Sequence, residues 1–315
     1  MSDIKEIRLC RPGDEIGITR LFKDIFGREM SLKEWQWKYP GYTNKRFYSS
    51  VAVNDSDEIV AHYGGMTPRM IYNNREMTAL SIGDVMVHPK YRSLKLFKKM
   101  AVLTPDEASK DGIIFGYGFP TERAFLLPLK LKLYDKLEDV AEATKPVGFH
   151  NNANRLMFKL FPLGFDDDRI DALWESVSRE LTLAVIRDRA YLAWRYQAPP
   201  LFSYEIWGLK RRWSVRLEGL AVLRGDGERM LLIDFVCPGY LLSALFRKIE
   251  NYAYTAGKKM LALWCPEYLK QQITQIGFSI QPAGTTIPLS THEGWLRKED
   301  IGGKFFYTMG DTDFL

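Results

Sequence analysis

The segment from Ser81 to Lys99 combines residue types that suit the binding of an anion. An apolar strand ends at residues 86–87, a turn follows, and a helix then begins. Backbone N–H groups at a helix N-terminus bind phosphate groups, helped by the helix dipole and by a nearby guanidinium. Arg92 supplies positive charge here, and the amides of Ser93 to Phe97 supply donors. The pattern predicts a strand–turn–helix junction, which is either an anion site or a plain junction with Arg92 at the surface.

The other reactive side chains do not gather into a recognisable site. The cysteines are odd in number and widely spaced, which favours neither a disulfide framework nor a zinc site. No two histidines have metal-ligand spacing, and the run 166–168 is expected to be acid at a helix N-terminus, so no metal site is predicted. The residues concerned are Cys10, Cys237, Cys265, His62, His88, His150 and His292.

The elements around the junction predict an α+β fold. Their order is a strand, two helices, three strands, a helix, a strand, a helix and a strand, which indicates an antiparallel meander that passes into a β-α-β unit. Strands are expected at residues 4–10, 47–54, 59–66, 76–87, 113–119 and 137–144, and helices after Asp14, Ser31 and Pro120 and at 94–108. Residues 151–164 are expected to form a connecting helix and linker.

The second half of the chain repeats features of the first in the same order. One such match could arise by chance, because strand–proline–helix junctions look alike, but several in one order favour duplication. We therefore expect two tandem domains, at residues 1–150 and 151–315. The matching runs are Trp-Lys-Tyr at 37–39 and Trp-Arg-Tyr at 194–196, Val-x-Pro-x-Tyr at 87–91 and 236–240, and Leu-Phe-Lys-Lys at 96–99 with Leu-Phe-Arg-Lys at 245–248.

Length and charge set the broad class. A chain of 315 residues is long enough for two domains, and its net charge of +5 favours an anionic ligand. No basic stripe is evident, so no nucleic acid is expected as a partner. The N-terminus lacks the apolar core of a signal peptide, and no apolar run reaches membrane-spanning length. We expect a cytoplasmic protein without membrane insertion.

Residues 87–92, Val-His-Pro-Lys-Tyr-Arg, resemble the cofactor-binding motif of the GNAT N-acetyltransferase superfamily. In that family a strand ending Val-x-Pro-x-Tyr-Arg runs through an Arg/Gln-x-x-Gly-x-Gly/Ala loop into a helix, and the surrounding order of elements also fits. The sequence departs from the motif at Lys95 and Phe97, where small residues are usual. The resemblance implies two GNAT-like domains, each a mixed, mostly antiparallel sheet flanked by helices. The second copy, which lacks an arginine at residues 240–244, is degenerate.

The same resemblance implies acetyl-CoA as an acyl donor. The pyrophosphate of coenzyme A would lie against the loop, and the end of the strand would pair with the pantetheine arm as an added strand does. The residues implied in binding are Met86, Val87, Arg92, Ser93, Leu94, Lys95, Leu96 and Phe97.

The implied reaction transfers an acyl group from coenzyme A to the amine of a small-molecule acceptor, such as an amino sugar. A base must take a proton from the amine, an N–H donor must stabilise the oxyanion, and an acid must protonate the leaving thiolate. By resemblance, the Val87 amide is the donor and Tyr134 is a candidate acid; Asp84, on the strand before the loop, is a candidate base. Tyr134 could instead be a core aromatic residue, and Asp84 a paired structural charge.

Two other functions fit the same residues. The missing glycines favour a non-catalytic tandem module that has lost coenzyme A. Aminoacyl transferases that use charged tRNA are also tandem GNAT-like folds, although their long helical arm is not evident in this sequence.

Overall fold

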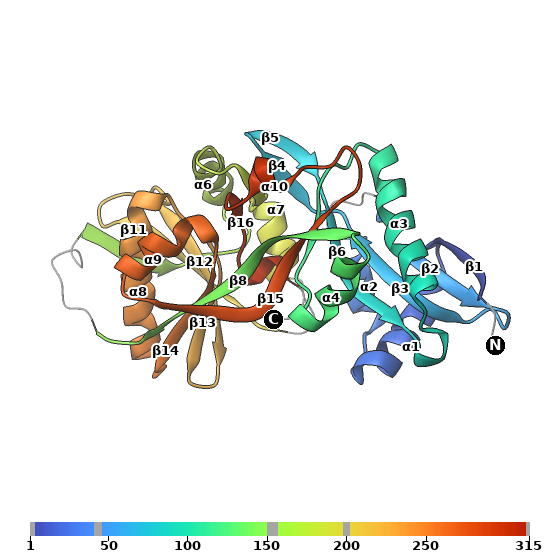
Figure 1. Ribbon diagram of the computed structural model, residues 1–315. Helices are drawn as coiled ribbons and strands as arrows, with labels where there is room; N and C mark the ends of the chain where they lie inside the picture. Colours follow the sequence, from blue (N-terminus) through green and yellow to red (C-terminus); the bar gives the residue numbers. More distant parts are fainter. Residues whose placement is uncertain (1–3, 41–45, 150–156, 198–201, 313–315) are drawn as a thin grey trace. The chain divides into compact units, whose positions relative to one another are not determined.

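The computed structural model of the protein describes residues 4–40, 46–149, 157–197 and 202–312 (Figure 1). The chain divides into two compact units. Unit 1 comprises Met1–Met70, Met77–Glu138 and Thr285–Gly302, and unit 2 comprises Ile71–Glu76, Asp139–Gly284 and Gly303–Leu315. The predicted boundary between residues 150 and 151 lies outside the described residues and stays a prediction.

Unit 1 is built on a five-stranded sheet. Its neighbouring strands are antiparallel except for the last pair, β6 and β7, which is parallel. The strand order is β1 (Ile4–Leu9), β2 (Ser50–Asn54), β3 (Ile59–Met66), β6 (Leu80–Val87) and β7 (Gly116–Gly118). The helices are α1 (Asp14–Phe26), α2 (Leu32–Lys38), α3 (Leu94–Lys110), α4 (Glu122–Lys130) and α10 (Lys298–Ile301). This arrangement confirms the predicted α+β class.

Helices cover both faces of this sheet, because its strands carry buried apolar residues on either side. Ile18 and Leu21 of α1 and Trp35 of α2 pack against one face. Leu96 and Met100 of α3 pack against the other. The end of β6 is thereby held between two apolar layers.

The strands β6 and β7 separate after three residues. They pair from Leu80 to Ile82, and β6 then continues to Val87 after β7 has ended at Gly118. A β-bulge lies just beyond this point, where Asp84 and Val85 together oppose Tyr63 of β3. Bulges bend a strand and increase its local twist. The bulge and the early end of β7 together free one edge of β6 at its C-terminal end.

Unit 2 repeats this plan around a seven-stranded sheet. Its strands β11, β12 and β13 are antiparallel, β13 carries a bulge at Ile233, and β14 runs parallel to β13. The strand order is β15 (Ser279–Ser290), β8 (Tyr134–Pro146), β14 (Met260–Cys265), β13 (Arg229–Val236), β12 (Gly219–Asp226), β11 (Glu205–Arg211) and β9 (Phe158–Pro162). Residues 134–138 of β8 and 285–290 of β15 belong to unit 1. The helices are α6 (Arg169–Ser178), α7 (Arg189–Leu192), α8 (Leu242–Thr255) and α9 (Lys270–Gln275).

Two local predictions were wrong, and one hairpin was not predicted. Residues 158–162 form strand β9 rather than helix or linker, because their alternating pattern pairs with β11. The long strand expected at 76–87 is interrupted at Ala79. Residues 69–78 form an unforeseen hairpin, β4 (Arg69–Tyr72) and β5 (Arg75–Thr78), in a four-stranded sheet with β10 (Leu183–Val185) and β16 (Phe305–Phe306). None of the described helices is long and apolar enough to cross a membrane.

Candidate functional site

The end of β6 presents its backbone to the opening left by β7. His88 donates its amide hydrogen to Val60 O at 2.8 Å, on one side of the Ala61–Val87 pair. In an antiparallel ladder this makes Ala61–Val87 a non-hydrogen-bonded pair, so the N–H and C=O of Val87 point away from β3. They point to the side from which β7 has departed. The geometry therefore leaves Val87 oriented to pair with an extended ligand.

The turn after β6 brings Arg92 back to this strand end. The exposed Arg92 side chain donates from Nε to Val87 O at 3.3 Å. Ser93 caps α3, with its Oγ accepting from Leu96 N at 3.1 Å. Val87, Arg92 and Ser93 are thus brought together, and their role in binding phosphate stays a prediction.

The other predicted cofactor residues divide into two groups. Leu94 and Lys95 are exposed in the first turn of α3. Met86 and Leu96 are buried on opposite faces of the sheet, so Met86 can take part through its backbone alone. Phe97 turns inward, with its ring centre 6.3 Å from that of Tyr63. The bulky residue at the usual Gly/Ala position therefore packs into the core.

Asp84 is buried in an ion pair next to the bulge. Its Oδ2 accepts from Lys38 Nζ at 2.6 Å and from Tyr39 Oη at 2.7 Å. Burial by itself raises the pKa of the carboxyl, but the Lys38 ammonium and the Tyr39 hydroxyl outweigh it and hold the pKa below its usual value. A lowered pKa weakens a base. Of the two alternatives for Asp84, these contacts favour the paired charge, and the catalytic role stays a prediction.

His62 of β3 is a candidate that the sequence analysis missed. Its side chain is buried, and Nδ1 lies 2.9 Å from the backbone oxygen of Asp84. A carbonyl only accepts, so Nδ1 carries the hydrogen and Nε2 keeps its lone pair. Burial lowers the pKa of the imidazole and keeps it neutral. Within the described chain Nε2 has no hydrogen-bond partner, which makes it a possible proton acceptor.

Tyr134 lies at the start of β8 and is buried. Its hydroxyl is 2.5 Å from that of Tyr63, the residue against which Phe97 packs. Burial raises the pKa of Tyr134 to about 12, although the hydrogen bond from Tyr63 partly opposes this rise. The hydroxyl therefore stays protonated at neutral pH and can donate. Its role as the acid stays a prediction.

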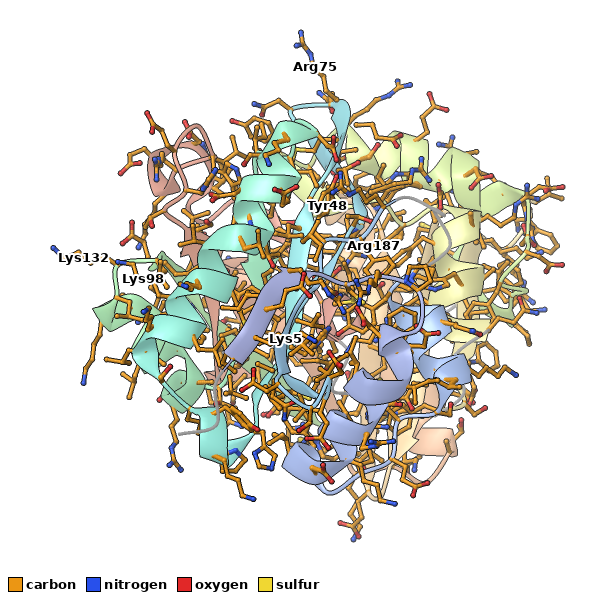
Figure 2. All side chains as sticks on the ribbon, turned by 90° about the vertical axis from the view of Figure 1, so that its right-hand side faces the viewer. Lys5, Tyr48, Arg75, Lys98, Lys132 and Arg187 are labelled. Carbon is orange, nitrogen blue, oxygen red and sulfur yellow. The ribbon has the colours of Figure 1, made fainter. Side chains whose placement is uncertain are left out.

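Unit 2 contains a matching Tyr–Asp contact. Tyr196 Oη donates to Asp234 Oδ2 at 2.7 Å, as Tyr39 does to Asp84, and Asp234 also lies beside a bulge. Here, however, the fully buried Arg187 donates to Asp234 at 2.7 Å and to Asp311 at 2.6 Å. Arg187 is fully buried, whereas Figure 2 shows the labelled Arg75 and Lys132 extending outward from the ribbon. The space beside Asp234 in unit 2 is therefore occupied by Arg187 and by a second carboxylate, that of Asp311.

Comparison with solved structures shows the fold. A conserved protein of unknown function from Enterococcus faecalis, described as a probable N-acyltransferase, has a TM-score of 0.69 at 12% identity, covering 90% of this chain and 72% of that one. A GCN5-related N-acetyltransferase from Kribbella flavida has a TM-score of 0.67 at 12% identity, covering 90% and 70%. Saccharomyces cerevisiae N-myristoyltransferase with bound myristoyl-CoA has a TM-score of 0.58 at 10% identity, covering 94% and 81%.

Comparison by sequence finds one family model that matches part of the chain. No curated protein matches the chain. Residues 6–129 match the family model of the acetyltransferase (GNAT) domain, and this range contains the strand–bulge–turn–helix junction described above. Residues 6–129 are therefore similar to the acetyltransferase (GNAT) domain.

Proposed function

We propose that this protein is an acyl-CoA-dependent N-acyltransferase that uses acetyl-CoA and acts on a small-molecule amine, such as an amino sugar. The observation that carries the proposal is the free edge of β6, where the Val87 backbone faces the opening beside Arg92. The GNAT match of residues 6–129 supports it. A protein of related fold has been solved with bound myristoyl-CoA, which supports an acyl-CoA ligand.

The residues at this edge fit coenzyme A. The Val87 C=O would accept from an amide of the pantetheine arm, as in strand addition, which leaves the Val87 N–H for the thioester oxygen. Arg92 and Lys95 would neutralise the pyrophosphate, and the first amides of α3 would donate to it. The Ser93 hydroxyl now satisfies the Leu96 amide, so a phosphate oxygen would take its place. Bound acyl-CoA supplies the thioester and the acyl group.

The protein groups would then stabilise the developing charge and transfer the protons. The Val87 N–H would stabilise the negative charge that develops on the thioester oxygen. His62 Nε2 would accept the amine proton, while the backbone oxygen of Asp84 fixes the tautomer. Asp84 would thus be a positioning residue, which modifies the base role predicted for it. Tyr134 would donate to the leaving thiolate, with Tyr63 donating to Tyr134 in turn.

Binding of acetyl-CoA tests the proposal. A ligand that binds the native state raises the melting temperature, and millimolar acetyl-CoA should do so. Arg92→Ala should weaken binding about tenfold, the size expected for one charge-assisted hydrogen bond. Arg20→Ala is the matched control, since Arg20 is an exposed arginine of α1 away from the junction. Absence of any shift in the wild type at millimolar ligand would overturn the proposal.

A second candidate is a non-catalytic module. The specific observation in its favour is that Phe97 replaces the usual small residue and that the Leu96 amide already has an internal partner. This candidate predicts that acetyl-CoA neither shifts the melting temperature nor releases thiol in the presence of the protein.

A further inference from the structure

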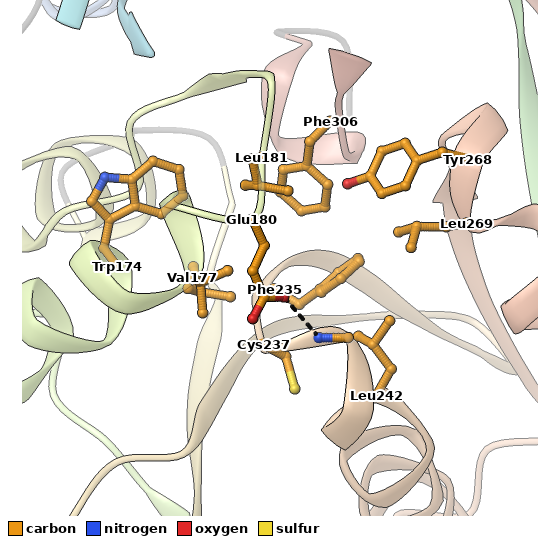
Figure 3. A pocket seen from close by; sticks show the side chains of 12 residues that line it. Trp174, Val177, Glu180, Leu181, Phe235, Cys237, Leu242, Tyr268, Leu269 and Phe306 are labelled. Carbon is orange, nitrogen blue, oxygen red and sulfur yellow. Dashed lines mark hydrogen bonds between the residues drawn. The ribbon is translucent and has the colours of Figure 1, made fainter. Parts of the chain in front are cut away.

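Unit 2 contains a pocket that opens to solvent. Figure 3 shows side chains from several elements around it. Trp174 comes from α6, Phe235 from β13, Leu242 from α8 and Phe306 from β16, and Tyr268 follows β14. The walls are therefore mainly aromatic and aliphatic.

The pocket lies at the unit 2 counterpart of the opening in unit 1. The strands β13 and β14 pair only from Arg229 to Leu231, and β13 then runs on to Val236. Val236, Cys237 and Gly239, which follow in the strand–turn–helix junction, all line the pocket. This is the junction that matches residues 87–91 in sequence. The pocket thus lies where the sequence run at residues 87–91 recurs in unit 2.

The charge at this junction is reversed between the two units. Unit 1 places Arg92 beside the strand end, whereas unit 2 places the carboxylate of Glu180 there. Glu180 Oε2 accepts from Gly239 N at 3.5 Å, the dashed line in Figure 3. Glu180 is exposed, and it is the charged residue among those that line the pocket. A carboxylate at this position repels a pyrophosphate and attracts a cation.

We infer that this pocket binds a small apolar amine in its ammonium form, as a second ligand site separate from acyl-CoA binding in unit 1. The apolar body would lie among Trp174, Phe235 and Phe306, where burial of its surface and ring contacts stabilise it. The ammonium would pair with Glu180 Oε1 at the mouth. Aromatic rings near that position add a favourable cation–π contribution.

Three phenyl compounds of similar size separate charge from shape. We would titrate 2-phenylethylamine, 2-phenylethanol and 3-phenylpropionate into the full-length protein and follow binding by calorimetry. The amine should bind about fivefold more tightly than the alcohol, the ratio that one exposed charge pair provides, and the carboxylate should bind most weakly.

Two variants locate the binding. Glu180→Gln keeps the shape of the side chain and should abolish the preference for the amine over the alcohol. Glu175→Gln is the matched control, because Glu175 is an exposed carboxylate of α6 that pairs with Arg179 and does not line the pocket. Leu181→Trp adds bulk at a partly exposed lining residue and should weaken all three compounds.

The inference is overturned if the amine does not bind, if the carboxylate binds as tightly as the amine, or if Glu180→Gln leaves the preference unchanged. If Leu181→Trp fails to fold, the preference for the amine over the alcohol in the wild type and in Glu180→Gln still tests the inference. Acetyl-CoA is titrated into the same variants as a separate readout. Its binding should be unaffected by Glu180→Gln, so failure of this pocket and failure of the unit 1 proposal give different results.

Discussion

Asp84 combines two costly features in one residue. Its φ is +45°, in the left-handed region that a non-glycine residue seldom adopts, and its carboxylate is buried with Lys38. Such strain persists only where the surrounding structure determines it. The backbone turn aims the Asp84 oxygen at His62, and the carboxylate holds Lys38 and Tyr39. The cluster is therefore organised around this single residue.

Replacing Asp84 by Asn should lower the free energy of unfolding by about 3 kcal/mol at pH 7, because the Lys38 ammonium would stay buried without that carboxylate. Urea unfolding measures the difference, with the exposed Asp55→Asn as control. The Asp84 pKa is lowered below its usual 3.8, so its stabilisation is present above about pH 4 and is lost as pH falls through the lowered pKa. A difference that stays constant from pH 7 to pH 2 would contradict this assignment.

The proton transfer proposed for His62 predicts a change in reaction rate. His62→Gln should slow release of coenzyme A thiol from acetyl-CoA in the presence of an amine about a hundredfold, without changing acetyl-CoA binding. The wild-type rate should rise with pH through the lowered pKa of His62 and level off above it, and the variant should lose this rise. His88→Gln is the control.

Tyr134→Phe should slow the same reaction, because the variant lacks the hydroxyl that would protonate the leaving thiolate. An unchanged rate would remove Tyr134 from the mechanism.

Sequence reasoning identified part of this site. The junction residues Val87, Arg92 and Ser93 are close in sequence, so their arrangement follows from local strand, turn and helix signals. Lys38 and His62 lie 46 and 22 residues from Asp84 and reach it only through the packing of α2 and β3 against β6. No spacing rule connects them. A buried histidine with one unsatisfied nitrogen becomes visible only in three dimensions.

Among the elements, β6 differs from an ordinary edge strand because a bulge interrupts its pairing with β3 near its C-terminal end. The sequence pattern predicted β3 with the bounds that the structure has, and it predicted α3 to within two residues. It could not predict the bulge, because the register depends on the partner strand. It also missed the break at Ala79, where the chain leaves β5 and enters β6.

Close backbone packing at the bulge makes Gly64 sensitive to substitution. A Cβ at Gly64 would lie 2.4 Å from Gly83 O and 2.5 Å from Tyr39 Oη. Gly64→Ala should therefore cost about 2 kcal/mol of stability and displace Tyr39 from Asp84. Gly239→Ala, whose Cβ would meet nothing within 4 Å, is the control. Equal thermal stability of the two variants would show that the bulge tolerates the added carbon.

At the scale of the whole molecule, the repeated motifs correctly indicate two units of similar plan, and the Tyr–Asp contact in each supports a duplication. The sequence did not predict that each unit includes a segment from the other half of the chain. Residues 71–76 belong to unit 2, and residues 285–302 belong to unit 1 although they lie late in the sequence. Such long-range pairing leaves no periodic signal in the chain.

Trp295 shows the importance of the late segment for unit 1. Its ring is 5% exposed, packs with Tyr48, Leu80 and Ile113, and donates to Ser109 Oγ at 2.6 Å. Trp295→Ala should lower the free energy of unfolding by about 3 kcal/mol through the cavity that it leaves. Trp213→Ala, at a side chain that is 92% exposed, should change it by less than about 0.5 kcal/mol. Comparable losses in both variants would contradict the assignment of this segment to unit 1.

The central claim is that acyl-CoA binds along the free edge of β6 in unit 1. The most direct measurement is an amide spectrum of the protein labelled with ¹⁵N-valine, titrated with acetyl-CoA and assigned at this position with Val87→Ile. We predict that the Val87 resonance shifts, while that of Val236, at the matching junction of unit 2, does not. A shift at Val236 without one at Val87, or no shift at millimolar acetyl-CoA, would contradict the account.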